Sequence, residues 1–260
     1  MGNSHPTKNA CYRLRFWTSD AEEVQDLDEL LAQLQSLLDR ATKEQRLAVF
    51  RSLRKEFSIH PLEADWNTSA EAILEAINRS ADITHRGIRG ILAEASFFTT
   101  VVPNLLATGW KDLSSAGEDR FDAKIQDTVG AERIQIKLQR RKSGKPMIGT
   151  DAPKSAGFAE DVFVVETQKT RAGKKGDTET RPYRFGDFDI LAVSLSPSTR
   201  NWNDFLFTVG DWLIPDPKDP MIIFKYQPVP PVPNAEWTND LVECIAWRRS
   251  GLKKRVRTSR

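Results

Sequence analysis

Apolar residues recur at helical spacing through the first hundred positions of the chain. Side chains three or four positions apart lie on one face of a helix. Residues 20–58 fit this pattern throughout, with apolar positions at Leu27, Leu30, Leu31, Leu34, Leu37, Leu38, Leu47, Phe50, Leu53 and Phe57. A third helix is predicted to open at 67–69. A fourth, from about Thr84, is predicted to bury Ile88, Ile91, Leu92, Ala95 and Phe98. We therefore expect a helical N-terminal region at 1–83, ahead of a core domain at 84–260.

From about residue 120 the apolar positions alternate with polar ones, which is typical of β-strands. Ile134, Ile136 and Leu138 share one parity of the stretch 133–139. Further strands are predicted at 120–126, 162–167 and 188–194, and a turn at 127–130 joins the first two. Helices combined with strands of this kind predict an α/β fold, with a central mixed sheet flanked by helices.

The other parity of the stretch 133–139 is polar and consists of Gln135, Lys137 and Gln139. Because successive side chains of a strand point to opposite faces, these three share one face of the predicted sheet. Asp122, on the neighbouring predicted strand, is expected to point at the same patch. A carboxylate, an amide oxygen and an ammonium at one strand pair suit metal-assisted phosphodiester hydrolysis. The solvated edge of an ordinary sheet would show the same alternation, so both interpretations stay open on these residues alone.

Five stretches of the chain, taken in order, resemble the PD-(D/E)XK nuclease superfamily and, within it, bacterial type II restriction endonucleases. They are RGIRGILAEASFF, RFDAKIQD, RIQIKLQRRK, VVETQKTRAG and RPYRFGDFDILAV. Asp122 matches the first acid of the family's motif and Lys137 matches its lysine. Gln135 stands where the family usually has Asp or Glu. The resemblance covers residues 84–247 and implies a restriction-endonuclease-like core.

This resemblance implies an endonuclease that uses Mg²⁺, with Mn²⁺ as a substitute. Asp122, Gln135 and the Ile136 carbonyl would supply oxygen ligands, which hard cations prefer. Glu94, on the helix expected beside the sheet, would bind the metal directly or hold one of its waters. Lys137 would orient or help deprotonate the attacking water and neutralise charge on the phosphate. The implied catalytic residues are therefore Glu94, Asp122, Gln135 and Lys137.

Basic and amide side chains that follow the second predicted strand are expected to contact DNA. Phosphate contacts are predicted for Arg140, Arg141, Lys142, Lys174 and Lys175. Contacts to base edges in the major groove are predicted for Gln139, Gln168, Lys169 and Arg171. An exposed side chain without a specific partner is the alternative for each. A palindromic site in double-stranded DNA would favour a homodimer, and region 1–83 would serve dimerisation or DNA contacts.

Composition says more about where the protein is expected to be found than about the reaction expected of it. The net charge is only +2, and the two cysteines form no spaced cluster for zinc or disulfides. The three histidines have no metal-ligand spacing. No apolar run reaches the roughly 18 residues of a membrane span, and the first residues lack the apolar stretch of a signal peptide. We expect a cytoplasmic bacterial protein that does not contact a membrane.

Two alternative functions remain open from the sequence. A repair or junction nuclease would keep the same core but recognise the structure of DNA rather than its sequence. A DNA-binding protein with an inactive nuclease core would explain why a neutral amide, Gln135, stands at an acidic position. The order Glu94, Asp122, Lys137 favours an active site over this last alternative.

Overall fold

The computed structural model describes residues 21–57, 60–115, 120–169, 174–175, 178–179 and 181–258, and gives only the backbone at 21–26, 55, 174–175 and 178–179. The chain divides into two compact units, Met1–Arg79 and Ser80–Arg260. The predicted side-chain roles of Arg171, Lys174 and Lys175 lie outside the described residues.

The first unit is helical, as the apolar spacing predicts. Its helices are α1 (Ala21–Arg40), α2 (Lys43–Glu56), α3 (Pro61–Asp65) and α4 (Ala70–Asn78). The stretch 20–58 is not one helix, because Thr42 caps α2: its hydroxyl accepts from the Gln45 N–H and Gln45 bonds back to the Thr42 N–H. This capping box ends α1 and begins α2. The expected start near Ser69 is confirmed, since Ser69 caps α4.

One arginine joins the last three helices of this unit. The Arg54 guanidinium lies 2.9 Å from Glu63 and 3.1 Å from Glu71, with its side chain 8% exposed. Glu63 also accepts from the N–H groups of His60 and Ala70, so its buried carboxylate is saturated with donors. Arg54 of α2 therefore has structural partners within its own unit.

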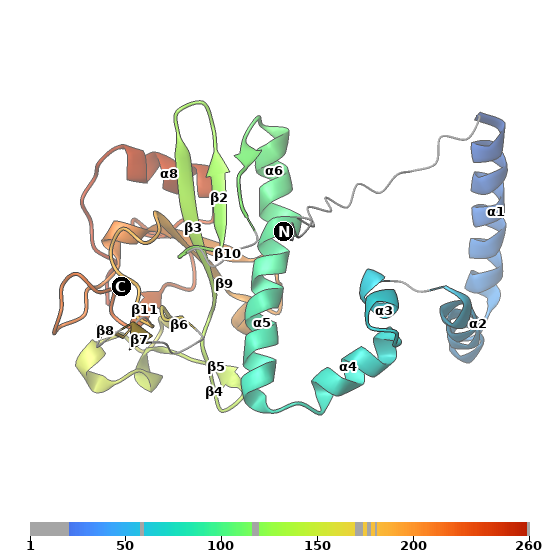
Figure 1. Ribbon diagram of the computed structural model, residues 1–260, viewed down its shortest axis with the longest axis horizontal. Helices are drawn as coiled ribbons and strands as arrows, with labels where there is room; N and C mark the ends of the chain where they lie inside the picture. The colour runs from blue at the N-terminus through green and yellow to red at the C-terminus, as the bar shows by residue number, and fades with distance from the viewer. Residues whose placement is uncertain are drawn as a thin grey trace, which may run out of the picture. The chain divides into compact units, whose positions relative to one another are not determined.

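The second unit is built on a five-stranded mixed sheet, which confirms the predicted α/β fold (Figure 1). Its strand order is β1 (Lys111–Asp112), β2 (Ala123–Gln126), β3 (Ala131–Leu138), β9 (Ile190–Ser194) and β10 (Phe205–Val209). β3 and β9 run parallel, and the other neighbours run antiparallel. The turn predicted at 127–130 is confirmed, since Asp127 accepts from the N–H groups of Val129 and Gly130.

One strand prediction was wrong in detail. The strand predicted at 162–167 is β6 (Phe163–Glu166), which pairs with β11 (Tyr226–Val229) in a separate two-stranded sheet. The aromatic stretch near Phe205 supplies the edge strand β10, and its Phe205 and Phe207 side chains are buried in the main core. Short hairpins and helices fill the connections: β4 (Arg141–Lys142), β5 (Lys145–Pro146), η2 (Gly149–Asp151), η3 (Lys154–Ala156), β7 (Lys174–Lys175), β8 (Thr178–Glu179), α7 (Ser196–Thr199) and η4 (Gly210–Trp212).

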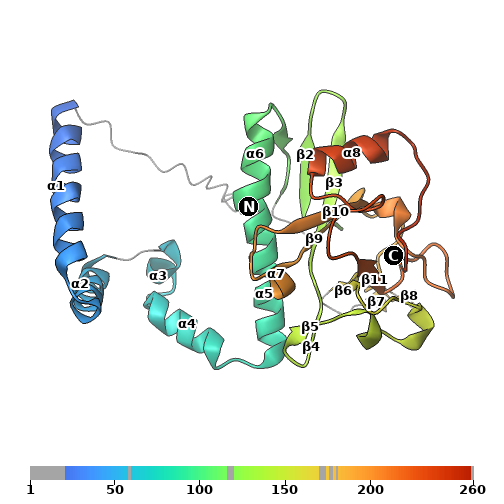
Figure 2. The ribbon, with the colours of Figure 1, turned by 180° about the vertical axis from the view of Figure 1, so that it is seen from behind.

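A long helix beside the sheet consists of α5 (Asp82–Ser96), a π-helical turn η1 (Phe97–Val101) and α6 (Val102–Ala107), visible in Figures 1 and 2. Its predicted buried stripe was wrong: Ile91 is 63% and Leu92 is 45% exposed, whereas Ala93 and Phe97 are fully buried. The small Ala93 side chain suits a close approach of the helix to the sheet, and helical period alone did not distinguish this face.

By length and composition alone, the segment Asp82–Ala107 is also apolar enough to cross a membrane. In the structure its buried residues Ala93, Phe97, Val102 and Leu105 belong to the main core. Its charged residues Arg86, Arg89 and Glu94 line a cavity in the same unit. We therefore interpret it as a core helix.

The last helix, α8 (Leu241–Arg249), is held by an ion-pair network at the start of β3. Arg249 binds Asp127 at 2.6 Å and Glu132 at 2.9 Å. Arg248 binds Glu132 at 3.0 Å and Asp189 at 2.7 Å. These contacts join residues more than 50 positions apart and stabilise the β2–β3 turn against the C-terminal helix.

Candidate active site

The β2–β3 hairpin places Asp122 directly opposite Gln135. Ala123 pairs with Ile134, and the Asp122 N–H donates to the Ile134 carbonyl at 3.0 Å, so the ladder continues by one residue. Directly opposed residues of an antiparallel pair point to the same face. Lys137, two positions after Gln135, shares that face. The structure therefore brings the predicted Asp122, Gln135 and Lys137 together.

The Asp122 carboxylate is fixed by two donors of β3. The Ile136 N–H donates to Asp122 Oδ2 at 2.7 Å, and the Gln135 side-chain amide donates to the same oxygen. Burial raises the pKa of Asp122 above its ordinary value, although Lys137 and these two hydrogen bonds act in the opposite direction. The carboxylate is thus held in place, but Lys137 and the two hydrogen bonds do not fully offset the cost of burying its negative charge.

Gln135 is buried rather than solvated, with only 1% of its surface exposed. Both parities of β3 are covered, since Ile134 and Ile136 are equally buried. This corrects the expectation of one core face and one polar face on this strand. The Gln135 Oε1 atom is buried and has no hydrogen-bond partner. A buried, unpaired acceptor beside a carboxylate is costly unless a ligand completes it.

Lys137 points toward Tyr183, a residue to which the sequence assigned no role. Its Nζ lies over the Tyr183 ring, 5.2 Å from the ring centroid. Burial would lower the pKa of Lys137, but Tyr183, Asp122 and Glu94 outweigh it and raise the pKa above its ordinary value. Burial likewise raises the pKa of the Tyr183 phenol. At neutral pH the pair is therefore an ammonium and a neutral phenol.

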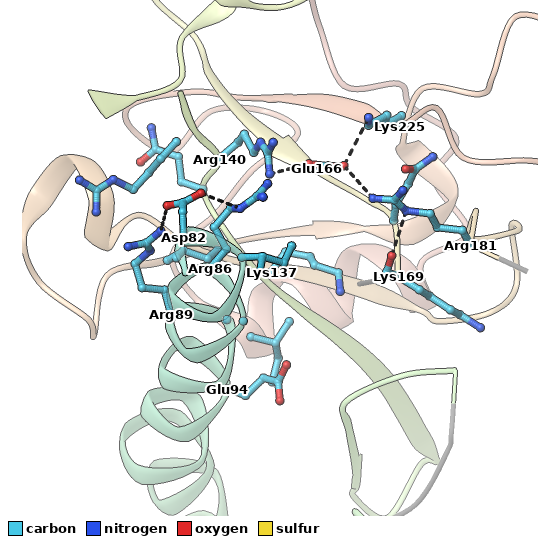
Figure 3. A pocket seen from close by; sticks show the side chains of 18 of the residues that line it. Asp82, Arg86, Arg89, Glu94, Lys137, Arg140, Glu166, Lys169, Arg181 and Lys225 are labelled. Carbon is cyan, nitrogen blue, oxygen red and sulfur yellow. Dashed lines mark hydrogen bonds and ion pairs between the residues drawn. The ribbon is translucent and has the colours of Figure 1, made fainter. Parts of the chain in front are cut away.

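Glu94 enters the same region from α5 and is half-buried (Figure 3). Burial raises its pKa above the ordinary value, and the nearby Asp122 charge raises it further, while Lys137 lowers it. Glu94 of the helix and Lys137 of the hairpin line the same cavity, so the two elements meet at one site. All four catalytic residues that the resemblance implied lie together in the fold.

The donors at this site fit a hard divalent cation such as Mg²⁺, which binds oxygen ligands. Asp122 and Glu94 offer carboxylates with raised pKa values, and Gln135 offers a buried amide oxygen that has no hydrogen-bond partner. The Gln135 Nε2 donates to Asp122 and, at 3.3 Å, to the Ile136 carbonyl, so the amide would have to exchange its two ends to bring its oxygen beside these two ligands. A bound cation would relieve both the carboxylate repulsion and the unpaired oxygen. The described residues contain no group of three or more His, Cys, Asp or Glu side chains that would hold a metal, so the set depends on the amide.

A cavity of about 510 Å³ adjoins this site and is lined by eight cationic and three acidic side chains. The cations are Arg86, Arg89, Lys137, Arg140, Arg141, Lys169, Arg181 and Lys225. Glu166 lies among them, 14% exposed, at 2.9 Å from Arg140, 3.4 Å from Lys225 and 3.8 Å from Arg181 (Figure 3). Asp82 pairs with Arg86 and Arg89 at the start of α5. The excess positive charge makes this cavity suitable for polyanions.

The predicted DNA-contact residues divide into several groups in the structure. Arg140, Arg141, Gln168 and Lys169 line the cavity, while Lys142 is half-exposed and pairs with Asp151 at 3.2 Å. Gln139 is only 1% exposed, with both polar side-chain atoms buried and unpaired. Gln139 also lines the cavity and forms an isolated antiparallel bridge with Val165. Its expected contact with a base edge stays a prediction.

Tyr183 and Glu166 are the site residues that sequence reasoning missed. Tyr183 stands 46 positions after Lys137, and no local pattern links them. Glu166 ends an apolar strand and gives no sign of its three basic partners. Both acquire their surroundings only from the way that β6 and the segment before β9 fold back toward β3.

Comparisons with known proteins give little further information. No family model and no curated protein matches the chain. Among solved structures, the bacterial homing endonuclease I-Ssp6803I is similar, at 19% sequence identity and a TM-score of 0.33. The match covers 64% of this chain and 94% of that one. A likeness at this level assigns neither a fold family nor an activity.

Proposed function

We propose that the protein is a Mg²⁺-dependent DNA endonuclease that hydrolyses phosphodiester bonds at the site formed by Asp122, Gln135, Lys137 and Glu94. The observation that carries this proposal is the convergence of these four side chains, from the hairpin and from α5, at the edge of a cation-lined cavity. Oxygen ligands, an ammonium and a basic approach surface are together what hydrolysis of a polyanionic phosphodiester requires.

Each residue has a definable task in this reaction. Asp122, Gln135 Oε1 and Glu94 would hold the cation, which when bound supplies Lewis acidity and an activated water. Because its pKa is raised, Lys137 is an ammonium at neutral pH and serves to stabilise charge on the phosphate rather than to accept a proton. Tyr183 would position that ammonium, which lies over its ring. This assignment favours the phosphate-neutralising role of Lys137 over the deprotonating one.

The finer proposal is a type II restriction endonuclease that cuts double-stranded DNA at a specific sequence as a homodimer. It is supported by the PD-(D/E)XK pattern of Asp122 and Lys137 and by the cavity residues Gln168 and Lys169, whose polar groups suit base edges. Arg140, Arg141 and Arg181 would then contact phosphates. A cytoplasmic bacterial location accords with this proposal.

One observation favours a second candidate, a DNA-binding protein without cleavage activity. Two acidic side chains among the described residues, Glu94 and Asp122, belong to the proposed ligand set, and the third polar ligand, Gln135, is neutral. The cation-lined cavity would bind DNA equally well in that case. Binding and cleavage must therefore be measured separately.

The decisive experiment incubates the protein with sequenced supercoiled plasmid in Mg²⁺, in Mn²⁺ and in a chelator, and maps any ends. We expect metal-dependent cutting that Lys137→Ala abolishes, while the affinity for a DNA duplex changes only a few-fold. Discrete fragments would support a restriction enzyme, whereas nicking at cruciforms or junctions would support a repair nuclease. Binding without cutting in either metal would establish the inactive alternative.

A matched pair of variants tests whether the cavity receives the DNA. Arg181→Ala with Lys225→Ala removes two cavity cations, and Lys218→Ala with Lys111→Ala removes two exposed cations that do not line the cavity. The slope of log DNA affinity against log salt concentration should become shallower by about one unit per lost phosphate contact. This change is expected only in the first pair. Equal slopes in both pairs would place the DNA elsewhere.

A further inference from the structure

Helices α1 and α2 expose an apolar surface that the other described residues of their own unit leave uncovered. Ten large apolar side chains of this segment are between 43% and 62% exposed. They are Leu27, Leu30, Leu31, Leu34, Leu37, Leu47, Val49, Phe50, Leu53 and Phe57. Monomeric proteins rarely expose so many apolar side chains together, and such surfaces usually mark an interface.

The spacing of the leucines in α1 is that of a helix–helix seam. Leu27, Leu31, Leu34 and Leu38 alternate at intervals of four and three residues, which is the a/d pattern of helices that pack along their length. An isolated helix of 20 residues with this composition gains most of its stability from packing its apolar face. The sequence of α1 therefore requires a partner helix.

The charges of the two helices indicate which partner fits. α1 contains six acidic residues and one arginine, a formal charge of −5, and α2 contains five basic and two acidic residues, a formal charge of +3. Packing α1 on α1 of a second copy would juxtapose like charges. Packing α1 on α2 of a second copy joins opposite charges, and two-fold symmetry repeats this contact. Arg54 is already bound to Glu63 and Glu71, which leaves Lys43, Arg46 and Arg51 among the described basic side chains of α2 for this contact.

We infer that α1 and α2 form the interface between two copies of this chain, with the acidic α1 of each copy packed on the basic α2 of the other. If each of the ten half-exposed side chains buries about 50 Å², two copies remove roughly 1,000 Å² from water, the lower limit of a specific interface. This inference does not depend on the proposed nuclease activity, although a dimer would supply the two sites that cutting both strands requires.

The first test measures the association of the full chain by sedimentation equilibrium from about 1 to 100 µM, the range of moderate affinities. Leu31→Glu with Leu34→Glu should raise the dimer dissociation constant about 100-fold. Ala32→Glu with Ser36→Glu adds the same charge to the opposite face of α1 and should change it less than about twofold. Because Leu31 and Leu34 are half-exposed in one chain, the fold should survive, which circular dichroism checks.

The second test examines the pairing of α1 with α2. Arg46→Glu with Arg51→Glu in one variant, and Asp28→Lys with Asp39→Lys in another, should each weaken self-association about tenfold, and an equimolar mixture should restore it as a heterodimer. If both charge-reversed variants dimerise as tightly as the parent, the pairing of α1 with α2 is wrong. A wild-type chain that stays monomeric at the highest concentration would overturn the interface itself. Plasmid cleavage by the site residues is measured separately, so failure here leaves the proposed function untouched.

Discussion

The backbone N–H of Ile136 donates a hydrogen bond to the Asp122 carboxylate at 2.7 Å, across the open end of the β2–β3 hairpin. Burial nevertheless raises the pKa of Asp122. The carboxylate is therefore held in place by the fold before any ligand binds, while its charge remains incompletely balanced. This combination suits a cation site and determines the first prediction.

Asp122→Asn should abolish metal-dependent cleavage without unfolding the protein, because the amide oxygen can still accept from Ile136. Without the Asp122 carboxylate, Mg²⁺ or Mn²⁺ should no longer raise the melting temperature of the variant, whereas both ions should raise that of the parent. Differential scanning fluorimetry with and without metal measures this. Asp211→Asn removes an exposed carboxylate and serves as the control. A metal-induced shift that persists in Asp122→Asn would remove this residue from the ligand set.

Gln135 offers the sharpest test of the site. Gln135→Ala should lose activity, since both the buried Oε1 and the donor to Asp122 disappear. Gln135→Glu should keep metal-dependent activity and change the preference between Mg²⁺ and Mn²⁺, because ligand charge tunes affinity for hard cations. Without metal, Gln135→Glu should also melt at a lower temperature, because it buries a second charge beside Asp122. Identical metal titrations for all three proteins would refute the ligand assignment.

Lys137→Ala should lower kcat by about 10²–10³-fold, the usual cost of removing one charge-stabilising group from a transition state. Tyr183→Phe should lower kcat by a smaller factor and leave KM unchanged, since Tyr183 acts only through the lysine. Because the phenol helps to raise the pKa of Lys137, the alkaline limb of the pH–rate profile should move to lower pH in this variant. Tyr226→Phe, in β11, is the control. An alkaline limb that is unchanged in Tyr183→Phe would mean that Tyr183 does not influence the pKa of Lys137.

The raised pKa values of Asp122 and Glu94 predict the acid limb of activity and a cost in stability. Cation binding needs both carboxylates deprotonated, so the rate should rise at pH values above the ordinary carboxyl range of about 4. Since the folded state binds these protons more tightly than the unfolded state, both groups lower stability as pH rises through that window. At neutral pH without metal, Glu94→Gln should raise stability by about 0.5–1 kcal/mol. Glu160→Gln, on the surface, should change neither property.

The network at the start of β3 predicts an opposite dependence on pH. Burial would raise the pKa of Asp189, but hydrogen bonds from Arg133 and the charge of Arg248 lower it below its ordinary value. Its contribution to stability is complete above the ordinary aspartate pKa and is lost as pH falls below about 4. Asp189→Asn should cost about 2–3 kcal/mol at neutral pH, less than a fully buried pair because both arginines are one-third exposed. Urea unfolding at neutral and acidic pH measures it, and the difference from the parent should shrink in acid.

Local patterns along the sequence were sufficient to predict α1, α2, α4, α5, the β2–β3 hairpin and the polar parity of β3, whereas the short α3 was not predicted. These features depend on spacing within about ten residues, and caps such as Ser69 and Asp240 act at the same range. The α/β class followed from them. The pattern also identified Asp122, Gln135, Lys137 and Glu94 as candidates, because strand alternation and family resemblance both act on short stretches.

Which face of each element is buried was decided only by the tertiary structure. Helical period alone selected Ile91 and Leu92 for the core of α5, yet Ala93 and Phe97 are the buried residues. Likewise, alternation placed Gln135 and Gln139 on a polar face and left a solvated sheet edge open as an alternative, but both side chains are only 1% exposed. A hydrophobic period shows that the faces of a helix or strand differ, but it does not show which neighbouring element covers each face.

The composition of the site also depends on contacts between distant segments. Tyr183 meets Lys137, and Glu166 gathers Arg140, Arg181 and Lys225, through the parallel pairing of β3 with β9 and the separate pairing of β6 with β11. Parallel strands need a long connection between them, and here that connection carries nine of the twenty residues that line the cavity. The sequence by itself determined which side chains were available for chemistry. Only the tertiary structure determined which of them are buried, paired and near enough to share a charge.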